Sequence, residues 1–314
     1  MLSLHRRPFS AAPILLLAAL LLSSCQPRFD RAAMLQSLSQ HVIVPTYADF
    51  TARADTLAAR AEALREQPSS ETLAATAEAW RAASTTWKET EAFELGPVQD
   101  DRINTKINFW PTRPQIIELT LSSDNAIDAE TVSRLSVAAR GLPALEYLLF
   151  DSTGQGTVNA TLLEESERGA RCRTYAAALA RDVADNAQQL LAAWEAEGDD
   201  FAATWGQGGD DAMEGPQEAL TMLTNRIVFL LEEIRHDKLG GPLGKEHGGA
   251  PAPYAAEAWR SSTSLAQINH NLLGLQRVYY GRMDSLQESA SQDAAQRPGL
   301  KDYLQTVDAP LADT

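Results

Sequence analysis

Cysteine is almost missing from this chain, which has only Cys25 and Cys172 among its 314 residues. Cys25 directly follows an apolar N-terminal segment, and we expect its thiol to carry a lipid. Cys172 is then left without a partner, so no intrachain disulfide can form even in an oxidising compartment. The stability of the fold must therefore come from its core.

The short motifs that mark common enzyme classes are missing as well. The sequence contains no HExxH, no paired CxxC and no glycine-rich phosphate loop. It also lacks GxSxG, which removes the usual nucleophile elbow of serine hydrolases. Any chemistry must therefore rest on less familiar arrangements of side chains.

Basic residues are scarce, since 27 Lys and Arg face 42 Asp and Glu, for a formal net charge of −15. Arg6 and Arg7 belong to a segment that we expect to be removed, which leaves the mature chain about two charges more acidic. Such a surface repels phosphates, so nucleic acid is excluded as a natural partner. Cations are compatible partners.

The N-terminus has a basic start, an apolar run and small residues before Cys25. This pattern predicts a secretory signal peptide over residues 1–24 rather than a membrane-spanning helix. Leu22-Ser23-Ser24-Cys25 fits a bacterial lipobox, which predicts a membrane anchor through a lipid on Cys25 and a tether over 25–35. Gln26, in place of Asp, favours the outer membrane facing the periplasm. Ordinary cleavage that leaves a free Cys25 thiol is the alternative.

Period-two alternation of apolar residues is absent, and helical periodicity is present almost everywhere, so we predict an all-α fold. The apolar stripes expected to form helix core faces are Leu73, Ala77, Trp80, Ser84 and Trp87; Leu179, Val183, Ala187, Leu190 and Trp194; Leu220, Leu223, Ile227, Leu230 and Ile234; and Leu265, Ile268, Leu272, Leu275, Tyr279 and Leu286.

Glycine- and proline-rich segments that interrupt the helices, together with one repeated segment, suggest two related helical halves. Residues 36–195 are predicted to form a first bundle that contains an irregular insertion at 96–128, and 196–314 a second bundle. The segment EAWRAAS at 78–84 returns as EAWRSST at 257–263, and we expect both copies to be helical.

An acid lies inside an apolar run at GLPALEYLLF, residues 141–150. Helical spacing from Leu142 and Leu149 places Glu146 at the edge of the core, so its carboxylate needs a partner. A salt bridge to Arg113 or Arg140 is one reading, and a ligand-binding or catalytic role is the other. Because of Pro143, either a helix begins at this point or a longer helix kinks there.

Several other residues are candidates for a site. Trp110 and Arg113 lie in the irregular stretch, where Arg113 could bind the carboxylate of Glu146. Glu233 and His236 have the Glu-x-x-His spacing of di-iron bundles, but only one such pair occurs, and a solvated helix end is the favoured explanation. His41 and His270 fall on helices, where packing or surface roles are usual. His247 lies in a glycine-rich loop and is expected to be exposed.

The run Gly141–Phe150 resembles the signature segment of the imelysin-like family of bacterial envelope proteins, GxHxxE followed by apolar residues. The segments 44–47, 93–97, 109–111 and 237–242 are similar to the same family. The resemblance implies two related four-helix bundles. It also implies a link to metal, because the family includes metallopeptidases, iron-regulated envelope proteins and relatives of a ferrous-iron uptake component. Here the position that matches the family histidine is Pro143, which cannot bind metal or transfer protons.

Three functional hypotheses follow. The first is a lipid-anchored, non-enzymatic binding protein for iron or other metal handling, with a ligand cleft lined by Glu146, Trp110, Arg113, Asp237 and Lys238. The second is a metallopeptidase in which zinc or iron is held by Glu146 with His41 or His270. The third is a structural lipoprotein that docks to envelope proteins, including those of an iron system.

Overall fold

The computed structural model describes residues 29–195, 198, 200–207, 215–245, 248–283 and 297–312. All regular secondary structure in these ranges is helical, and the only strand-like feature is an isolated bridge between Phe150 and Val158. The all-α prediction is therefore confirmed. The signal peptide, Cys25 and His247 lie outside the described residues. Within them, no helix is both long enough and apolar enough to cross a membrane.

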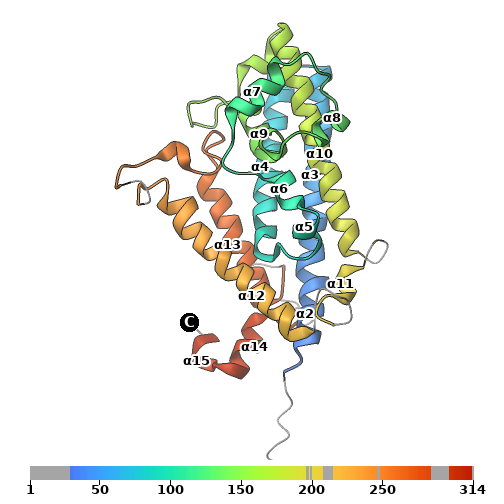
Figure 1. Cartoon of the computed structure of the whole chain (residues 1–314), viewed down its shortest axis with the longest axis vertical. Helices are drawn as coiled ribbons and strands as arrows, with labels where there is room; N and C mark the ends of the chain where they lie inside the picture. Colours follow the sequence, from blue (N-terminus) through green and yellow to red (C-terminus); the bar gives the residue numbers. More distant parts are fainter. Residues whose placement is uncertain are drawn as a thin grey trace, which may run out of the picture. The chain divides into compact units, whose positions relative to one another are not determined.

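The helices follow one another along the compact unit Arg31–Thr314 (Figure 1). In chain order they are α2 (Arg31–Leu38), the π-helix η1 (Ser39–Ile43), α3 (Val44–Glu66), α4 (Ser70–Thr90), η2 (Glu91–Phe93), α5 (Pro97–Asp100), α6 (Ile103–Ile107), α7 (Pro114–Ser122), α8 (Ala129–Ser133), η3 (Val137–Ala139), α9 (Gly141–Leu149), η4 (Ala160–Leu163), α10 (Glu167–Trp194), α11 (Phe201–Thr204), α12 (Pro216–Glu233), the π-helix η5 (Ile234–Gly240), η6 (Pro253–Ala255), α13 (Ser264–Tyr280), α14 (Leu300–Val307) and α15 (Ala309–Ala312).

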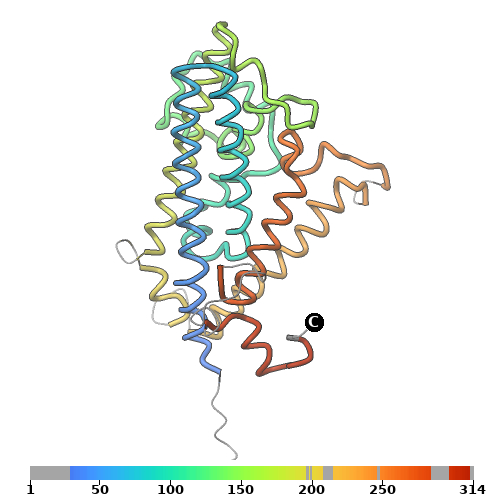
Figure 2. The backbone as a smooth tube through the Cα atoms, turned by 180° about the vertical axis from the view of Figure 1, so that it is seen from behind, coloured from blue at the N-terminus to red at the C-terminus, as the bar shows by residue number. Residues whose placement is uncertain are grey.

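The first half is built on the long helices α3, α4 and α10, which run side by side, with α9 packed against α4 and α10 (Figures 1 and 2). The stripes predicted on α4 and α10 are buried between them. Aromatic side chains fill the space, as where the rings of Phe50 and Trp87 lie 5.0 Å apart. Burial of these large rings supplies much of the hydrophobic stabilisation of the bundle.

The insertion at 96–128 is more regular than predicted. It contains the short helices α5, α6 and α7, which pack along α10. Ile103, Ile107 and Ile117 are fully buried there. These apolar side chains are too sparse to give a helical stripe, but each anchors one short helix on the bundle.

The second half contributes two helices of more than ten residues within the described ranges, α12 and α13. Helix α12 packs against α2 and η2, and α13 packs against α4. The described residues therefore do not trace a complete second four-helix bundle. The arrangement of two related bundles stays a prediction.

The prediction that both copies of the echoed segment are helical is wrong for the second copy. EAWRAAS lies within α4, whereas residues 257–263 form a series of turns before α13. Ala258 and Ser262 have positive φ angles of 53° and 59°, which no right-handed helix contains. The two copies share a sequence but differ in structure, because Glu257 and Ser261 of the second copy bond buried side chains of other segments.

The predicted core face of α13 is also wrong. Leu265 and Leu272 remain 75% and 46% exposed, and Leu286 lies outside the described residues. Helix α13 instead buries a polar and small face against α4, made by Gln267, Asn271, Gly274 and Val278. The amide of Gln267 bonds Ser84, and the amide of Asn271 bonds the backbone oxygen of Lys88.

Gly274 marks the closest approach of α13 to α4. A Cβ atom at this position would overlap the backbone oxygen of Glu89, which cannot move away like a flexible side chain. We therefore expect Gly274→Ala to lower the free energy of unfolding by about 1–3 kcal/mol, measured by urea denaturation. In an exposed helix the same change would stabilise the protein by roughly 1 kcal/mol. The sign of the change in the free energy of unfolding therefore shows whether Gly274 is packed against α4. Asn269→Ala on the exposed side of α13 is the control, and an unchanged or more stable Gly274→Ala protein would contradict the packing.

Candidate functional site

The signature run begins a helix rather than kinking one, which settles the alternatives that Pro143 left open. Helix α9 starts at Gly141, so Pro143 lies in the first turn, where its missing N–H costs no hydrogen bond. Gly141 has φ of 76°, and a Cβ atom there would overlap the backbone oxygen of Ile107. Glycine is therefore required where α9 enters the bundle.

Glu146 is buried, with 3% of its surface exposed, and its partner is a serine. Its Oε1 accepts the backbone N–H of Ser261 at 2.9 Å and the hydroxyl of Ser261 at 2.8 Å. Burial raises the pKa of Glu146, while the bonds from Ser261 and the nearby Arg260 act in the opposite direction.

The predicted ion pair between Glu146 and Arg113 or Arg140 is wrong. Arg140 pairs with Asp182, and its Nε lies 2.9 Å from Asp182 Oδ2. Arg113 is exposed at the start of α7. Sequence spacing could not find Ser261, because the bond spans 115 positions in the chain.

A buried network of charges lies where α4, η2, η5 and the turn before α13 meet. Lys88 is fully buried, and its Nζ lies 2.6 Å from Glu91 and 2.5 Å from Glu257. Lys238 lies 2.8 Å from the second oxygen of Glu91 and 3.2 Å from that of Glu257. Asn271 completes the network through its amide oxygen, 2.8 Å from Lys238 Nζ.

The network fixes the charge of its members. Burial alone would raise the pKa of Glu91, but Lys238 and Lys88 hold it well below its ordinary value. The pKa of Glu257 is lowered in the same way against the effect of burial. Burial would lower the pKa of Lys238, yet Glu91 and Glu257 raise it. Glu91, Glu257 and Lys238 are therefore ionised at neutral pH.

A cavity of 620 Å³ opens beside this network, under the insertion. Glu94 and Glu233 line it, and both share the guanidinium of Arg226, at 3.5 and 3.8 Å. The pKa of Glu94 is raised to about 7, mainly by burial, because Arg226 only partly offsets burial and the nearby Glu91 and Glu233 act in the same direction as burial. Burial also raises the pKa of Glu233. The charges of these two carboxylates are less well neutralised by nearby cations than those of Glu91 and Glu257.

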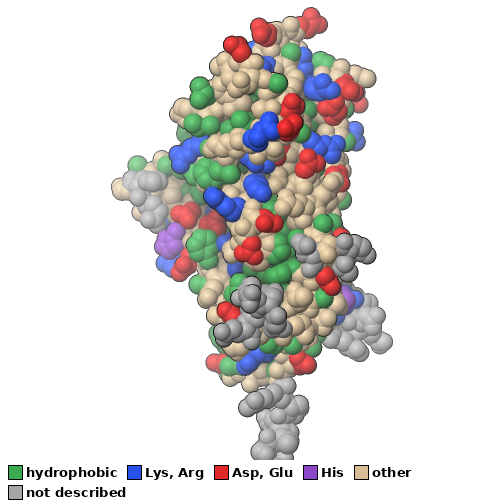
Figure 3. Space-filling view, turned by 45° about the vertical axis from the view of Figure 1, so that its right-hand side comes forward, with side chains coloured by type: hydrophobic (Ala, Val, Ile, Leu, Met, Phe, Trp, Pro, Cys, Tyr) green, Lys and Arg blue, Asp and Glu red, His purple; other side chains and the backbone are tan. Residues whose placement is uncertain are grey.

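Carboxylates outnumber cations at this acidic pocket. Its acids are Glu91, Glu94, Glu233, Asp237 and Glu257, and its cations are Lys88, Arg226 and Lys238. Five negative charges against three positive ones leave a net charge of −2 when all are ionised. Elsewhere acidic and basic side chains intermingle, as on the face in Figure 3. A positively charged ligand would complete the charge balance of the pocket.

The residues proposed from the sequence are divided between several places. Trp110 and Asp237 line the acidic pocket, and Lys238 belongs to its buried network. Glu146 is connected to the pocket only through the turn that carries both Glu257 and Ser261.

The two candidate histidines lie elsewhere. His41 falls in η1, and His270 Nδ1 lies 2.6 Å from Glu89, which also pairs with Arg277.

Sequence reasoning missed most of the charged residues of the pocket: Lys88, Glu91, Glu94, Arg226 and Glu257. One signal was available, since Lys88 and Glu91 continue the spacing of the buried stripe on α4 after Ser84 and Trp87. Buried charges at helical spacing within a core stripe indicate a polar cluster.

A resident metal does not fit around Glu146. One oxygen of Glu146 already accepts two hydrogen bonds from Ser261, and Pro143, about one turn earlier on α9, cannot bind metal. Across the described ranges, no group of three or more His, Cys, Asp or Glu side chains is placed to hold a metal ion.

Glu146→Gln tests the buried carboxyl, since Gln keeps an oxygen that accepts both bonds from Ser261. Burial raises the pKa of Glu146 in the folded state, so the stability that the protonated acid contributes is lost as pH rises through that pKa. We expect the free energy of unfolding of Glu146→Gln, relative to wild type, to increase from about pH 4 to about pH 7 in urea titrations.

Glu146→Ala is the matched comparison, because it leaves the two buried donors of Ser261 unpaired. This variant should lose about 1–3 kcal/mol more than Glu146→Gln at every pH. Equal losses of unfolding free energy in the two variants would contradict the bonds between Glu146 and Ser261. A stability difference between Glu146→Gln and wild type that does not change with pH would contradict the raised pKa of Glu146.

Comparison with known proteins agrees with the resemblance in the signature run. The chain is 26% identical over 268 residues to iron-regulated protein A of Synechococcus elongatus, covering 84% of this chain and 68% of the relative. An iron-regulated protein A precursor from Parabacteroides distasonis has a similar structure, with a TM-score of 0.74 at 19% identity, over 93% of this chain and 83% of that one. An imelysin-like protein from Psychrobacter arcticum matches with a TM-score of 0.57 at 19% identity, over 90% and 83%. The family model described as Imelysin matches residues 43–314, and the chain therefore belongs to the imelysin family.

Proposed function

We propose that this imelysin-family protein is a non-enzymatic binding protein of the bacterial envelope that serves iron or other metal handling. Membership of the family and the name of the Synechococcus relative, iron-regulated protein A, support the link to iron. The lipobox at Cys25 supports an anchor in the outer membrane, facing the periplasm. Two related helical halves are the proposed framework, and the pocket draws residues from both.

The acidic pocket is the proposed ligand site, and the observation that carries this is the pair Glu94 and Glu233. Both carboxylates are at least partly buried, and their cations, Arg226 for both and Lys238 also for Glu233, lie 3.5–3.9 Å away, beyond a normal hydrogen bond. A buried carboxylate without full compensation is costly, so a bound cation would stabilise the pair. The ligand is therefore a small cationic species.

A metal ion would enter this pocket as cargo and would keep part of its own ligand shell. Glu91 and Glu257 are already paired with the lysines, although Oε2 of Glu257 makes no hydrogen bond among the described residues. Glu94, Glu233 and Asp237 are the other carboxylates that line the cavity. One or two carboxylates with several retained waters are a common mode of holding hard divalent cations. An organic cation would use the same carboxylates through charge-assisted hydrogen bonds.

Peptidase activity is not part of the proposal. In the family motif the histidine and glutamate act together, whereas this chain has Pro143 and uses Glu146 to hold the turn at Ser261. The geometry around Glu146 supports a structural bond between two segments.

Titration calorimetry of the purified protein tests the binding function, using Fe(II) under anaerobic conditions, Zn(II), and 1,4-diaminobutane as an organic cation. We expect saturable binding of at least one probe. The double variant Glu94→Gln with Glu233→Gln should weaken it about tenfold or more, because charged contacts are lost. Glu78→Gln, at an exposed position on α4, is the control and should bind like wild type.

The same titrations have an expected pH dependence. The pKa of Glu94 is raised to about 7, so below that pH a proton competes with the cationic ligand for this carboxylate. Affinity should therefore rise from about pH 6 to about pH 8 in the wild type, and this rise should be smaller in Glu94→Gln, where only Glu233 still titrates with a raised pKa. Absence of saturable binding by all three probes would refute the binding function. Binding that the double variant retains would place the ligand elsewhere.

A further inference from the structure

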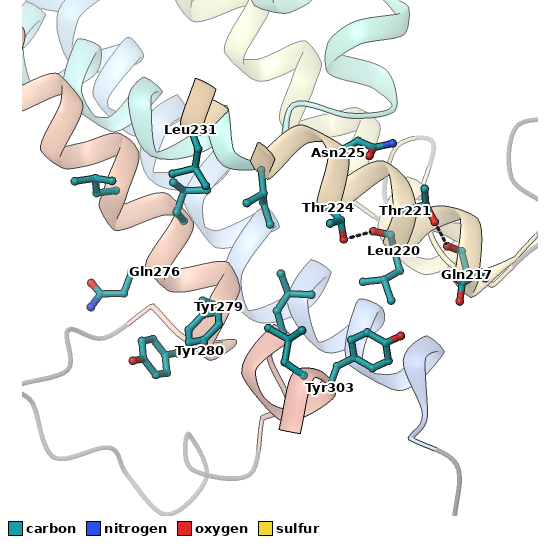
Figure 4. Close-up of a pocket in the computed structure, with 15 residues that line it drawn as sticks. Gln217, Leu220, Thr221, Thr224, Asn225, Leu231, Gln276, Tyr279, Tyr280 and Tyr303 are labelled. Atoms are coloured by element: carbon teal, nitrogen blue, oxygen red, sulfur yellow. Dashed lines mark hydrogen bonds between the residues drawn. The ribbon is translucent and has the colours of Figure 1, made fainter. Parts of the chain in front are cut away.

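A second cavity, of 730 Å³, lies between α12, α13 and α14 and has the opposite character to the acidic pocket (Figure 4). None of its lining residues is charged, although the chain carries 42 acidic residues. Leucine, isoleucine and tyrosine side chains from all three helices make most of the wall. Apolar cavities of about 300–1,000 Å³ with few polar groups, set between helices, are the usual form of a small-molecule site.

The cavity exposes large apolar side chains of both long helices, and Leu272 among them belongs to the predicted core face of α13. Leu231 on α12 and Leu272 on α13 both line it and are each 46% exposed. Exposure of such a stripe is unfavourable by about 25 cal/mol for each Å² of apolar surface, so a cover would stabilise the protein. A contiguous apolar groove of this kind marks a binding site.

The rest of the chain is poorly suited to fill the groove. After Arg31, the residues that the structure does not describe contain only two large apolar side chains, Met213 and Leu286. Two such side chains are too few to cover a groove that extends from Leu220 to Leu231, about 16 Å along α12. The apolar run before Cys25 belongs to residues 1–24, which we expect to be removed, so we infer that the occupant is a separate molecule.

One end of the groove carries positive charge. Tyr280 lines this end, and its ring lies 5.4 Å from the guanidinium carbon of Arg282 and 5.7 Å from Lys301 Nζ. Neither Arg282 nor Lys301 is a lining residue, so both act on the cavity through their charge rather than by direct contact.

We propose that this groove binds a single-chain anionic amphiphile, a fatty acid. The alkyl chain lies between α12 and α13, along Leu272, Leu275 and Leu231. The carboxylate lies at the Tyr280 end, where the positive charges of Arg282 and Lys301 stabilise it. This site shares no residue with the acidic pocket, and it goes beyond the proposed cation-binding function.

The test is titration of lipid-stripped protein with dodecanoate and, separately, with 1-dodecanol, which has the same chain and a neutral head. We expect one dodecanoate to bind per protein. Leu272→Asp and Leu231→Asp each place a carboxylate in the groove and should weaken binding about tenfold or more. Arg282→Gln should weaken dodecanoate but leave dodecanol unchanged, which separates the head contact from the chain contact.

Leu265→Asp and Val228→Asp are the matched controls, because both side chains are exposed on the same helices outside the lining. They should bind dodecanoate like wild type, and circular dichroism should show that all variants are folded. Absence of saturable dodecanoate binding to the wild type would overturn the proposal, as would binding that both lining variants retain. A wild-type dimer that Leu272→Asp dissociates, without fatty-acid binding, would assign the groove to a second copy of the chain. Binding only to phospholipid vesicles would assign it to a membrane surface.

Discussion

The burial of two lysine ammonium groups is the interaction on which the rest of this structure depends. Each carboxylate bridges both lysines, since Glu91 and Glu257 each give one oxygen to Lys88 and the other to Lys238. The four groups come from α4, η2, η5 and the turn before α13. Loss of any one would leave an uncompensated charge in the interior, at a cost of about 3–5 kcal/mol. These four segments are therefore fixed relative to one another by electrostatics more than by apolar packing.

The network also connects the signature run to the acidic pocket. Glu257 and Ser261 lie four residues apart on one turn. The turn therefore forms an ion pair with Lys88 at one end and a hydrogen bond with Glu146 at the other. Two positive φ angles within it direct those side chains inward. Glu146 thus acts in this chain as a positioning residue: it holds the turn that supplies Glu257 to the network.

Helix content and the core of the first half were predictable because they depend on local periodicity. Trp80 and Trp87 recur at helical spacing on α4, and the structure buries both. The partner of Glu146 was not predictable, since Arg113 and Arg140 are the obvious cations but Ser261 lies 115 residues away. The acidic pocket was found only in part. Asp237 and Lys238 were proposed, whereas Lys88 was hidden in an apolar stripe where a charge is stable only with partners from distant segments.

The failed prediction for α13 follows from the same electrostatic constraint. Asn271 must face α4, because its amide bonds Lys88, Glu91 and Lys238, and Gly274 allows the approach that those bonds require. The apolar residues of α13 lie on a neighbouring face of the helix, so they cannot be buried against α4 at the same time. Periodicity identifies the apolar face correctly but assumes that it points to the nearest core. Here satisfying buried charge takes precedence over burying leucine, and the apolar groove beside α12 is the consequence.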